Sequence, residues 1–255
     1  MSGLKVLSTP FDLDFKEDLL NLEFDDSPLL LKEGLRYLDL AGWYEYLCDI
    51  PTLEPDNRHF SVDCELNLKK WWEISYQPEK AQVYAHSNTR QPLHNDNAWF
   101  ADGAEVNFFA MERQARAGGA QIIYPVSRLI TDLASAQPEL LRDLCDCEVV
   151  IKKGADAAAH RTSVIREGAK TRCYWNFYRI DKTDAYIMKM CDAFFSFLER
   201  KESSSSVIRV FCDTNDCLVF NDTLLLHGRE SFEAKNAYDR ILHQSMWKFK
   251  AIGSF

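Results

Sequence analysis

The sequence has no long apolar run and no sign of an export signal. Its first twenty residues, MSGLKVLSTPFDLDFKEDLL, lack the apolar segment of a signal peptide. No stretch approaches the roughly 20 apolar residues that are needed to cross a bilayer. The eight cysteines form no Cys-x-x-Cys pair, and the spacing of Cys145 and Cys147 suits zinc poorly. We therefore expect a cytoplasmic protein whose thiols are free and mostly buried.

An excess of basic residues is also missing. The chain carries 30 Lys and Arg against 39 Asp and Glu, a net charge of −9, which makes nucleic acid and anionic membranes unfavourable partners. An anionic small molecule is not excluded, because it would meet a local arginine rather than the average field. With no internal repeat and no linker, the 255 residues are expected to form one domain, 1–255, with a sizeable core.

The hydrophobic pattern predicts an α+β protein that is mainly β. Helical spacing of apolar residues predicts helices at 15–22, 29–47, 125–133, 138–144 and 183–200, with a mostly helical N-terminal layer over 1–80. Strands are predicted at 82–86, before His94, and at 105–111, 120–124, 148–152, 172–180, 207–211, 217–221, 223–227 and 239–249. Short strands with inserted helices favour a double-stranded β-helix, or jelly roll, over residues 82–250.

Three residues could form a metal site in the mouth of such a barrel. His94 and Asp96 stand at i and i+2, so on a strand both side chains point to one face. His227 can then close a three-ligand facial site with open positions, which suits non-haem Fe(II) oxygenases. A single His-x-Asp pair is a weak signal among six histidines and 39 acidic residues. Its weight comes from the order of the three residues and from the arginine that follows.

That arginine is Arg240, at the start of the last predicted strand. Strand alternation puts Arg240, Leu242, Gln244 and Met246 on one face and His243 on the other, so His243 is expected to be structural. A guanidinium binds a carboxylate through two parallel hydrogen bonds and stays charged when buried. Arg240 is therefore a candidate for binding an acidic cosubstrate.

These residues resemble the taurine dioxygenase and clavaminate synthase-like branch of the Fe(II)/2-oxoglutarate-dependent oxygenases. The motifs are His94-Asn-Asp96, Gly118-Gly119-Ala-Gln121, the segment 215–222 ahead of His227-Gly-Arg229, and Arg240-Ile-Leu-His. The resemblance implies Fe(II) held by His94, Asp96 and His227. It also implies 2-oxoglutarate and O2 as cosubstrates, with the remote carboxylate of 2-oxoglutarate bound to Arg240. Gln121 stands where a threonine often touches the cosubstrate.

The resemblance also implies the reaction: oxidation of an unactivated C–H bond, most simply hydroxylation, with decarboxylation of 2-oxoglutarate to succinate. Retention of Asp96 favours oxygen chemistry over halogenation. Gln244 replaces an arginine with which some relatives bind anionic substrates, which argues against a sulfonate held in that way. Desaturation or cyclisation, a non-catalytic metal-binding barrel and zinc-dependent hydrolysis remain alternatives.

The substrate is the least determined part. Polar residues near the expected site are candidates for binding it, although each can equally serve a surface or loop role: Asn88, Arg90, Asn97, Arg229 and Gln244. Trp99 would form an apolar wall, and Tyr178 and Arg179 could line the mouth. The short chain leaves little room for a large lid, which favours a small polar metabolite, a free amino acid or a derivative. The sequence does not determine the oligomeric state.

Overall fold

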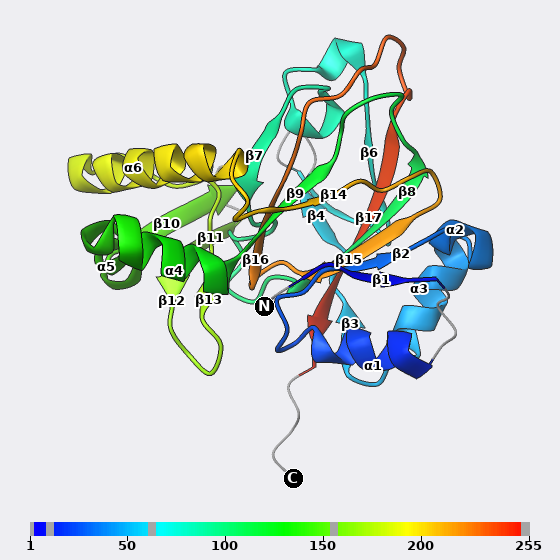
Figure 1. Cartoon of the computed structure of the whole chain (residues 1–255), viewed down its shortest axis with the longest axis horizontal. Helices are drawn as coiled ribbons and strands as arrows, with labels where there is room; N and C mark the ends of the chain where they lie inside the picture. Colours follow the sequence, from blue (N-terminus) through cyan, green and yellow to red (C-terminus); the bar gives the residue numbers. More distant parts are fainter. Residues whose placement is uncertain (1–2, 9–12, 61–64, 154–157, 251–255) are drawn as a thin grey trace.

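Two sheets form the centre of the protein (Figure 1). The computed structural model describes residues 3–8, 13–60, 65–153 and 158–250. The larger sheet has seven strands in the order β1-β2-β15-β8-β17-β3, and β6 also pairs with β17. Its strands are β1 (Lys5–Leu7), β2 (Leu29–Leu31), β3 (Leu53–Pro55), β6 (Trp72–Ser75), β8 (Val106–Arg113), β15 (Cys217–Asn221) and β17 (Ile241–Phe249). All of its pairings are antiparallel except that of β1 with β2.

The smaller sheet has four antiparallel strands in the order β14-β9-β16-β7. They are β7 (Gln91–His94), β9 (Gln121–Pro125), β14 (Ile208–Val210) and β16 (Leu225–Arg229). Three two-stranded ribbons complete the β structure: β4 (Arg58–Phe60) with β5 (Leu66–Leu68), β10 (Glu148–Lys153) with β11 (Ala158–Ser163), and β12 (Ile165–Arg166) with β13 (Arg172–Cys173).

Strand alternation divides the core into three clusters. On β8, Val106 and Phe108 pack against the N-terminal helices, whereas Phe109 belongs to a cluster with residues of both sheets, including Ile123 of β9. On β16, Leu226 belongs to the cluster on the outer face of the smaller sheet. Its neighbour His227 contacts the rings of Phe109 and Phe220. The two sheets therefore pack face to face, and every second residue of their strands points into the space between them.

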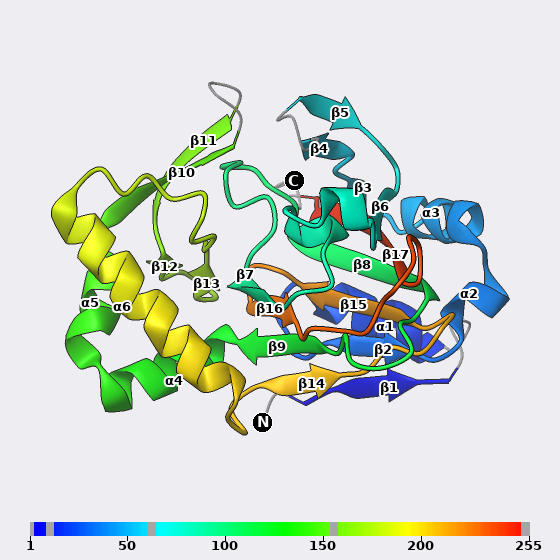
Figure 2. The ribbon, with the colours of Figure 1, turned by 90° about the horizontal axis from the view of Figure 1, so that it is seen from above.

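The helices lie in two groups on opposite sides of the strands (Figures 1 and 2). The first group covers the larger sheet and comprises α1 (Leu13–Asn21), α2 (Gly34–Tyr37) and α3 (Leu40–Cys48). The second covers the smaller sheet and comprises α4 (Val126–Ala136), α5 (Pro138–Asp146) and α6 (Ala185–Glu202). Two short 3-10 helices, η1 (Pro78–Lys80) and η2 (Tyr84–His86), precede β7. In the described part of the chain, no helix combines the length and the apolar character that a bilayer-spanning segment requires.

Most predicted elements are present, but three are wrong. The layer expected over residues 1–80 to be mostly helical is mixed, because it contains strands β1–β6 as well as helices α1–α3. The segment 29–47, predicted as one helix, begins with strand β2. The strand predicted at 82–86 is instead the turn η2. The strand predicted over 172–180 ends after Cys173; residues 174–176 are irregular and residues 177–179 form a turn. In each case tertiary packing overrides a local apolar pattern.

The cysteines behave as predicted. The seven that the structure describes carry free thiols, and four of them, Cys173, Cys191, Cys212 and Cys217, are buried. Burial in apolar surroundings raises the pKa of the Cys191 thiol to about 11, which keeps it protonated and unreactive. Cys64 lies outside the described residues.

Candidate active site

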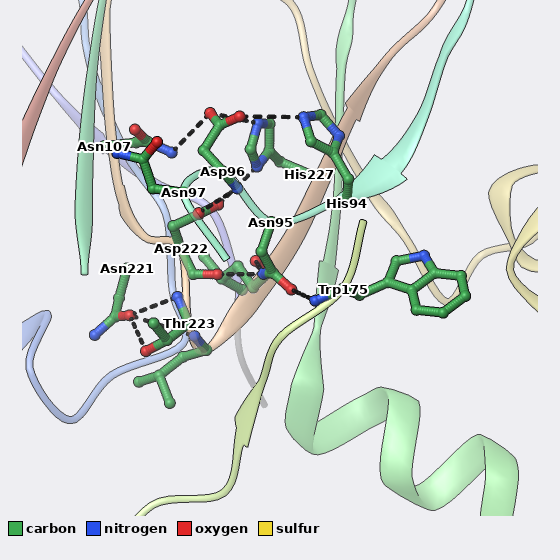
Figure 3. Close-up of polar contacts among 12 residues, drawn as sticks. His94, Asn95, Asp96, Asn97, Asn107, Trp175, Asn221, Asp222, Thr223 and His227 are labelled. Carbon is green, nitrogen blue, oxygen red and sulfur yellow. Dashed lines mark hydrogen bonds and ion pairs between the residues drawn. The ribbon is translucent and has the colours of Figure 1, made fainter. Parts of the chain in front are cut away.

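The three predicted metal ligands converge between the two sheets (Figure 3). His94 ends β7 and pairs directly with His227 of β16, while Asp96 lies in the turn that follows β7. Asp96 Oδ1 lies 3.3 Å from His94 Nε2, and Asp96 Oδ2 lies 3.3 Å from His227 Nε2. One potential ligand atom from each residue falls within 4.8 Å of the other two. Two imidazole nitrogens and one carboxylate in this arrangement can hold a divalent cation.

Hydrogen bonds orient both histidines. Nδ1 of His94 lies 2.9 Å from the carbonyl oxygen of Pro92, and Nδ1 of His227 lies 2.8 Å from Oδ1 of Asp222. Each acceptor takes the proton on Nδ1, so Nε2 is the nitrogen of each ring that faces Asp96. Nε2 is therefore the nitrogen through which each imidazole would bind a metal ion, which would take the place of a proton there.

Asp222 also belongs to the candidate site, although the sequence did not indicate it. Its Oδ2 accepts a hydrogen bond from the backbone N–H of Asp96 at 2.7 Å, so one buried carboxylate fixes both His227 and the turn carrying Asp96. Asn95 strengthens this turn by donating from Nδ2 to the carbonyl oxygens of Asp222 and Leu225 and by accepting from the backbone N–H of Trp175 (Figure 3). The sequence signal was the aspartate five residues before His227.

Electrostatics make this cluster suited to a cation. Burial opposes protonation of His227, but the carboxylates of Asp222 and Asp96 outweigh it and raise the pKa of His227 to about 10. Burial likewise works against ionisation of Asp96, and the two histidines nevertheless hold its pKa well below the usual range. Both shifts show that the site stabilises positive charge next to the Asp96 carboxylate.

A cavity of about 300 Å³ opens next to the three residues and is lined from both sheets. Arg240, Leu242, Gln244 and Met246 all line it, as strand alternation predicted. His243 points to the opposite side, where its Nε2 lies 2.7 Å from Oε2 of Glu112. The predicted orientation of β17 is therefore correct, although a bulge lies between Ile241 and Leu242.

Arg240 is 1% exposed, and burial lowers its pKa to about 10, so it remains charged at neutral pH. Its Nε donates to Oε1 of Gln114 at 3.3 Å, and it forms no ion pair with any carboxylate among the described residues. Gly119, at φ +77°, lies close to it: a Cβ there would stand 3.4 Å from Arg240 Nε. The positive φ of Gly118 and Gly119, which glycine adopts readily, is what the turn before β9 requires beside the guanidinium.

Gln121 also lines the cavity and contacts Arg240. With its amide oriented so that both ends are satisfied, Gln121 donates to the carbonyl oxygen of Gly228 at 3.0 Å and accepts from Arg240 Nη2 at 3.2 Å. Gln121 therefore lies beside Arg240, the residue at which the resemblance places the remote carboxylate of 2-oxoglutarate.

Two substrate candidates, Gln244 and Asn97, lie in the cavity next to Asp96. Gln244 Nε2 donates to Asp96 Oδ2 at 2.7 Å and to Asn107 Oδ1 at 2.8 Å. Asn97 adopts the left-handed conformation at φ 51°, and its Nδ2 lies 3.2 Å from the sulfur of Met246. Gln244 therefore orients the carboxylate ligand.

Arg229, another substrate candidate, lines the cavity, but its guanidinium donates hydrogen bonds to backbone carbonyl groups. Its Nη2 donates to the carbonyl oxygens of Tyr84, Ser87 and Thr89, at 3.3, 2.8 and 2.9 Å. Burial, and the nearby charge of Arg240, lower its pKa to about 9. Arg229 fixes the loop that leads into β7.

Two of the substrate candidates, Asn88 and Arg90, take the alternative loop role. Residues 84–90 form a 3-10 turn and a loop. Arg90 forms ion pairs with Glu199 and Glu202 of α6, and neither Arg90 nor Asn88 lines the cavity. Trp99, Tyr178 and Arg179 do line it, as do His59 and Trp72, which the sequence did not indicate.

Comparison with known proteins identifies the family. A family model described as "Taurine catabolism dioxygenase TauD, TfdA family" matches residues 52–246. Comparison with curated proteins gave no match.

Three solved structures illustrate the likeness in fold. Asparagine oxygenase aligns with a TM-score of 0.70 and 11% identity, over 92% of this chain and 78% of that one. The non-heme iron oxygenase OrfP, in complex with Fe and alpha-ketoglutaric acid, gives 0.65 and 11%, over 92% and 79%. The PvcB protein of Pseudomonas aeruginosa gives 0.57 and 14%, over 86% and 74%. At these identities the structures show a shared fold. The family match, which covers well over half of the chain, shows that the protein belongs to the TauD/TfdA family of dioxygenases.

Proposed function

We propose that this protein is an Fe(II)/2-oxoglutarate-dependent oxygenase with a single double-stranded β-helix domain, which hydroxylates a C–H bond of a small polar metabolite. The observation that carries the proposal is the convergence of His94, Asp96 and His227 in one cavity with the buried Arg240. Family membership favours an enzyme over a metal-binding barrel without activity. The two facing sheets fit the jelly-roll core that the sequence predicted.

The donor set fits Fe(II). Two neutral imidazoles and a carboxylate, with open positions toward a cavity, are the ligands of non-haem iron oxygenases. His94 and His227 would bind through Nε2, because Nδ1 of each is engaged by Pro92 and Asp222. Asp96 would bind through a carboxylate oxygen while Gln244 holds the other. Bound Fe(II) would supply the redox chemistry that couples decarboxylation of 2-oxoglutarate to oxidation of the substrate.

Arg240 and Gln121 fit the cosubstrate. A buried guanidinium without a carboxylate partner in the described structure is costly unless a ligand supplies one. The remote carboxylate of 2-oxoglutarate would form a two-point ion pair with Arg240. Gln121 would hold the arginine in position through Nη2, and its amide could itself contact the cosubstrate.

The size of the cavity limits the substrate. About 300 Å³ is at the lower end of ligand pockets, which suits 2-oxoglutarate and a substrate of amino-acid size. Solved structures of similar fold include an asparagine oxygenase and OrfP in complex with (3S)-hydroxy-L-Arg. We therefore propose a free amino acid or a derivative as substrate. Product analysis would distinguish hydroxylation from desaturation or cyclisation.

The first test is anaerobic titration of the metal-free protein with Fe(II) and 2-oxoglutarate, following the weak visible charge-transfer band of the chelate. We expect the band with both additions and with neither alone. His227→Ala should abolish it. His243→Ala is the matched control on the outer face of β17 and should retain it. Absence of the band in a folded, metal-loaded protein would refute the proposed cofactors.

A further inference from the structure

We infer that the side-chain amide of Gln91 donates a hydrogen bond to the oxygen of 2-oxoglutarate that would bind the metal beside His94. The inference rests on the proposed function and adds a positioning residue to it. Gln91 would act at the metal-binding end of the cosubstrate, whereas Arg240 would act at the remote end. The inference follows from the pairing of β7 with β16 and from the contact between Gln91 and His94.

A bulge in β7 turns Gln91 toward the cavity. His94 pairs with His227 of β16. Two residues farther along β16, Arg229 pairs with Gln91, which stands three residues before His94. Regular alternation would place residues 91 and 94 on opposite faces of the strand, and the extra residue of the bulge cancels that difference. Both side chains accordingly line the cavity.

Gly228, which lies opposite the bulge, makes this pairing possible. A Cβ at Gly228 would stand 2.7 Å from the carbonyl oxygen of Gln91 and 3.2 Å from the backbone nitrogen of Leu93. The two strands therefore approach more closely here than a larger residue would allow. Pro92, which has no N–H to donate to a neighbouring strand, lies inside the bulge. The chain thus fixes the backbone from which the Gln91 side chain extends.

The amide of Gln91 reaches the metal-binding nitrogen of His94. Gln91 Nε2 lies 3.1 Å from His94 Nε2, and the amide is the donor because the imidazole proton is on Nδ1, which faces Pro92. A metal ion on His94 Nε2 would occupy the lone pair that accepts this bond. The amide N–H would then need another acceptor, since an unpaired donor inside a cavity is unfavourable. The bond to Pro92 orients His94 in either case.

The cosubstrate supplies the acceptor that remains. Asp96 Oδ2 already accepts from Gln244, and Oδ1 of the same carboxylate is the oxygen left to bind the metal. An oxygen of a ligand at an open position of the metal would lie next to both His94 and the Gln91 amide.

Strand register places Gln91 along the path of 2-oxoglutarate. Gln91, Arg229 and Gln121 form one row across the neighbouring strands β7, β16 and β9 (Figure 2). The far end of this row contacts Arg240, through Gln121. The near end contacts His94, through Gln91. A cosubstrate that extends from the metal to Arg240 would therefore pass beside the Gln91 amide.

Two 2-oxo acids separate the two ends of the cosubstrate. Pyruvate has the 2-oxo acid group of 2-oxoglutarate but lacks the remote carboxylate. Titration of the charge-transfer band of the full-length, Fe(II)-loaded protein gives both dissociation constants. Gln91→Met keeps the length of the side chain without the amide and should weaken both ligands about tenfold. Arg240→Ala should weaken 2-oxoglutarate and spare pyruvate.

Gln91→Glu is a second variant of the same shape. Its carboxylate cannot donate and would repel an anionic ligand, so it should weaken 2-oxoglutarate more than Gln91→Met does. An unchanged affinity for 2-oxoglutarate in both variants would overturn the inference.

Metal affinity distinguishes contact with the cosubstrate from support of His94. Without cosubstrate, Gln91→Met should bind Co(II) as tightly as the unchanged protein or more tightly, because the amide no longer competes for His94 Nε2. A loss of metal affinity in parallel with that for 2-oxoglutarate would show a structural role and would overturn the inference. Gln137→Met, at a partly buried glutamine between α4 and α5 and outside the cavity, is the matched control and should change neither affinity.

The two proposals can fail separately. Absence of the charge-transfer band in the unchanged protein would refute the proposed cofactors, and the role of Gln91 with them. A normal band that gives the same 2-oxoglutarate affinity with and without the Gln91 amide would refute the role of Gln91 alone.

Discussion

Oδ1 of Asp222 lies 2.8 Å from Nδ1 of His227, and the other oxygen of the same carboxylate accepts the backbone N–H of Asp96. One side chain therefore orients two of the three candidate metal ligands. Carboxylate–histidine pairs of this kind fix the ring and raise its basicity toward a metal.

Replacing Asp222 should weaken metal binding while leaving the three ligands in the chain. We expect Asp222→Ala to lower the affinity for Fe(II) or Co(II) about tenfold to a hundredfold. Asp222→Asn keeps the volume of the side chain and one acceptor, and should lose less. Metal titration followed by calorimetry measures both. Asp146→Asn, at an exposed residue of α5, is the control, and unchanged affinity in Asp222→Ala would contradict the role.

Arg240 should act on the cosubstrate and not on the metal. Arg240→Ala is expected to raise the dissociation constant of 2-oxoglutarate about tenfold to a hundredfold, because it removes a charge-assisted pair. Arg240→Lys keeps the charge but lacks the planar fork, so its dissociation constant for 2-oxoglutarate should lie between those of the unchanged protein and Arg240→Ala. The charge-transfer band, titrated with 2-oxoglutarate, gives these constants. Metal affinity measured without the cosubstrate should stay the same, and a parallel loss of metal would indicate a structural role instead.

Arg90 should contribute to stability and not to substrate binding. Its ion pair with Glu202 compensates a carboxylate that is 5% exposed and also accepts from the N–H of Leu93 in β7. Arg90→Ala leaves that carboxylate without its cation and should lower the free energy of unfolding by about 1–3 kcal/mol.

Urea denaturation measures this loss, and the double variant Arg90→Ala/Glu202→Gln should recover part of it. Changed affinity for a substrate, with unchanged stability, would restore Arg90 to the substrate site.

The parts of the site that the sequence predicted depend on short-range geometry. His94 and Asp96 are two residues apart in the sequence and so stay close, although Asp96 lies in the turn after β7 and not on the strand as expected. Alternation along β17 placed Arg240 and Gln244 together without knowledge of the fold. His227 was found because its motif and the following arginine occur in order. Predictions from such short-range rules hold in the folded structure because they do not depend on how distant segments pack.

The parts that were missed depend on how distant segments meet. Asp222 accepts a hydrogen bond from the backbone N–H of Asp96, and the two residues lie in turns far apart in the sequence. Trp72 lines the cavity because β6 pairs with β17. Arg90 takes the loop role because the loop before β7 turns through η2 and directs it to α6. Neither the pairing of β6 nor the direction of that loop is encoded in a local pattern.

His59 provides a prediction about pH. It is 6% exposed, its Nε2 has no hydrogen-bond partner in the described structure, and burial lowers its pKa to about 4. The nearby Asp96 and Asp56 oppose this shift, while Lys153 and Lys69 add to it. In the unfolded chain the pKa returns to about 6.5, so below that pH the unfolded state binds more protons than the folded state.

The stability contributed by neutral His59 is therefore present above pH 6.5 and is lost as the pH falls toward 4. Between pH 7 and pH 5 the loss amounts to about 2 kcal/mol. His59→Phe keeps a ring against Trp72 but cannot bind a proton, so its free energy of unfolding should fall less over the same interval. Urea denaturation of both proteins at the two pH values, with a chelator present, measures the difference. If both lose the same stability, His59 is protonated in the folded protein and its burial does not control the acid response.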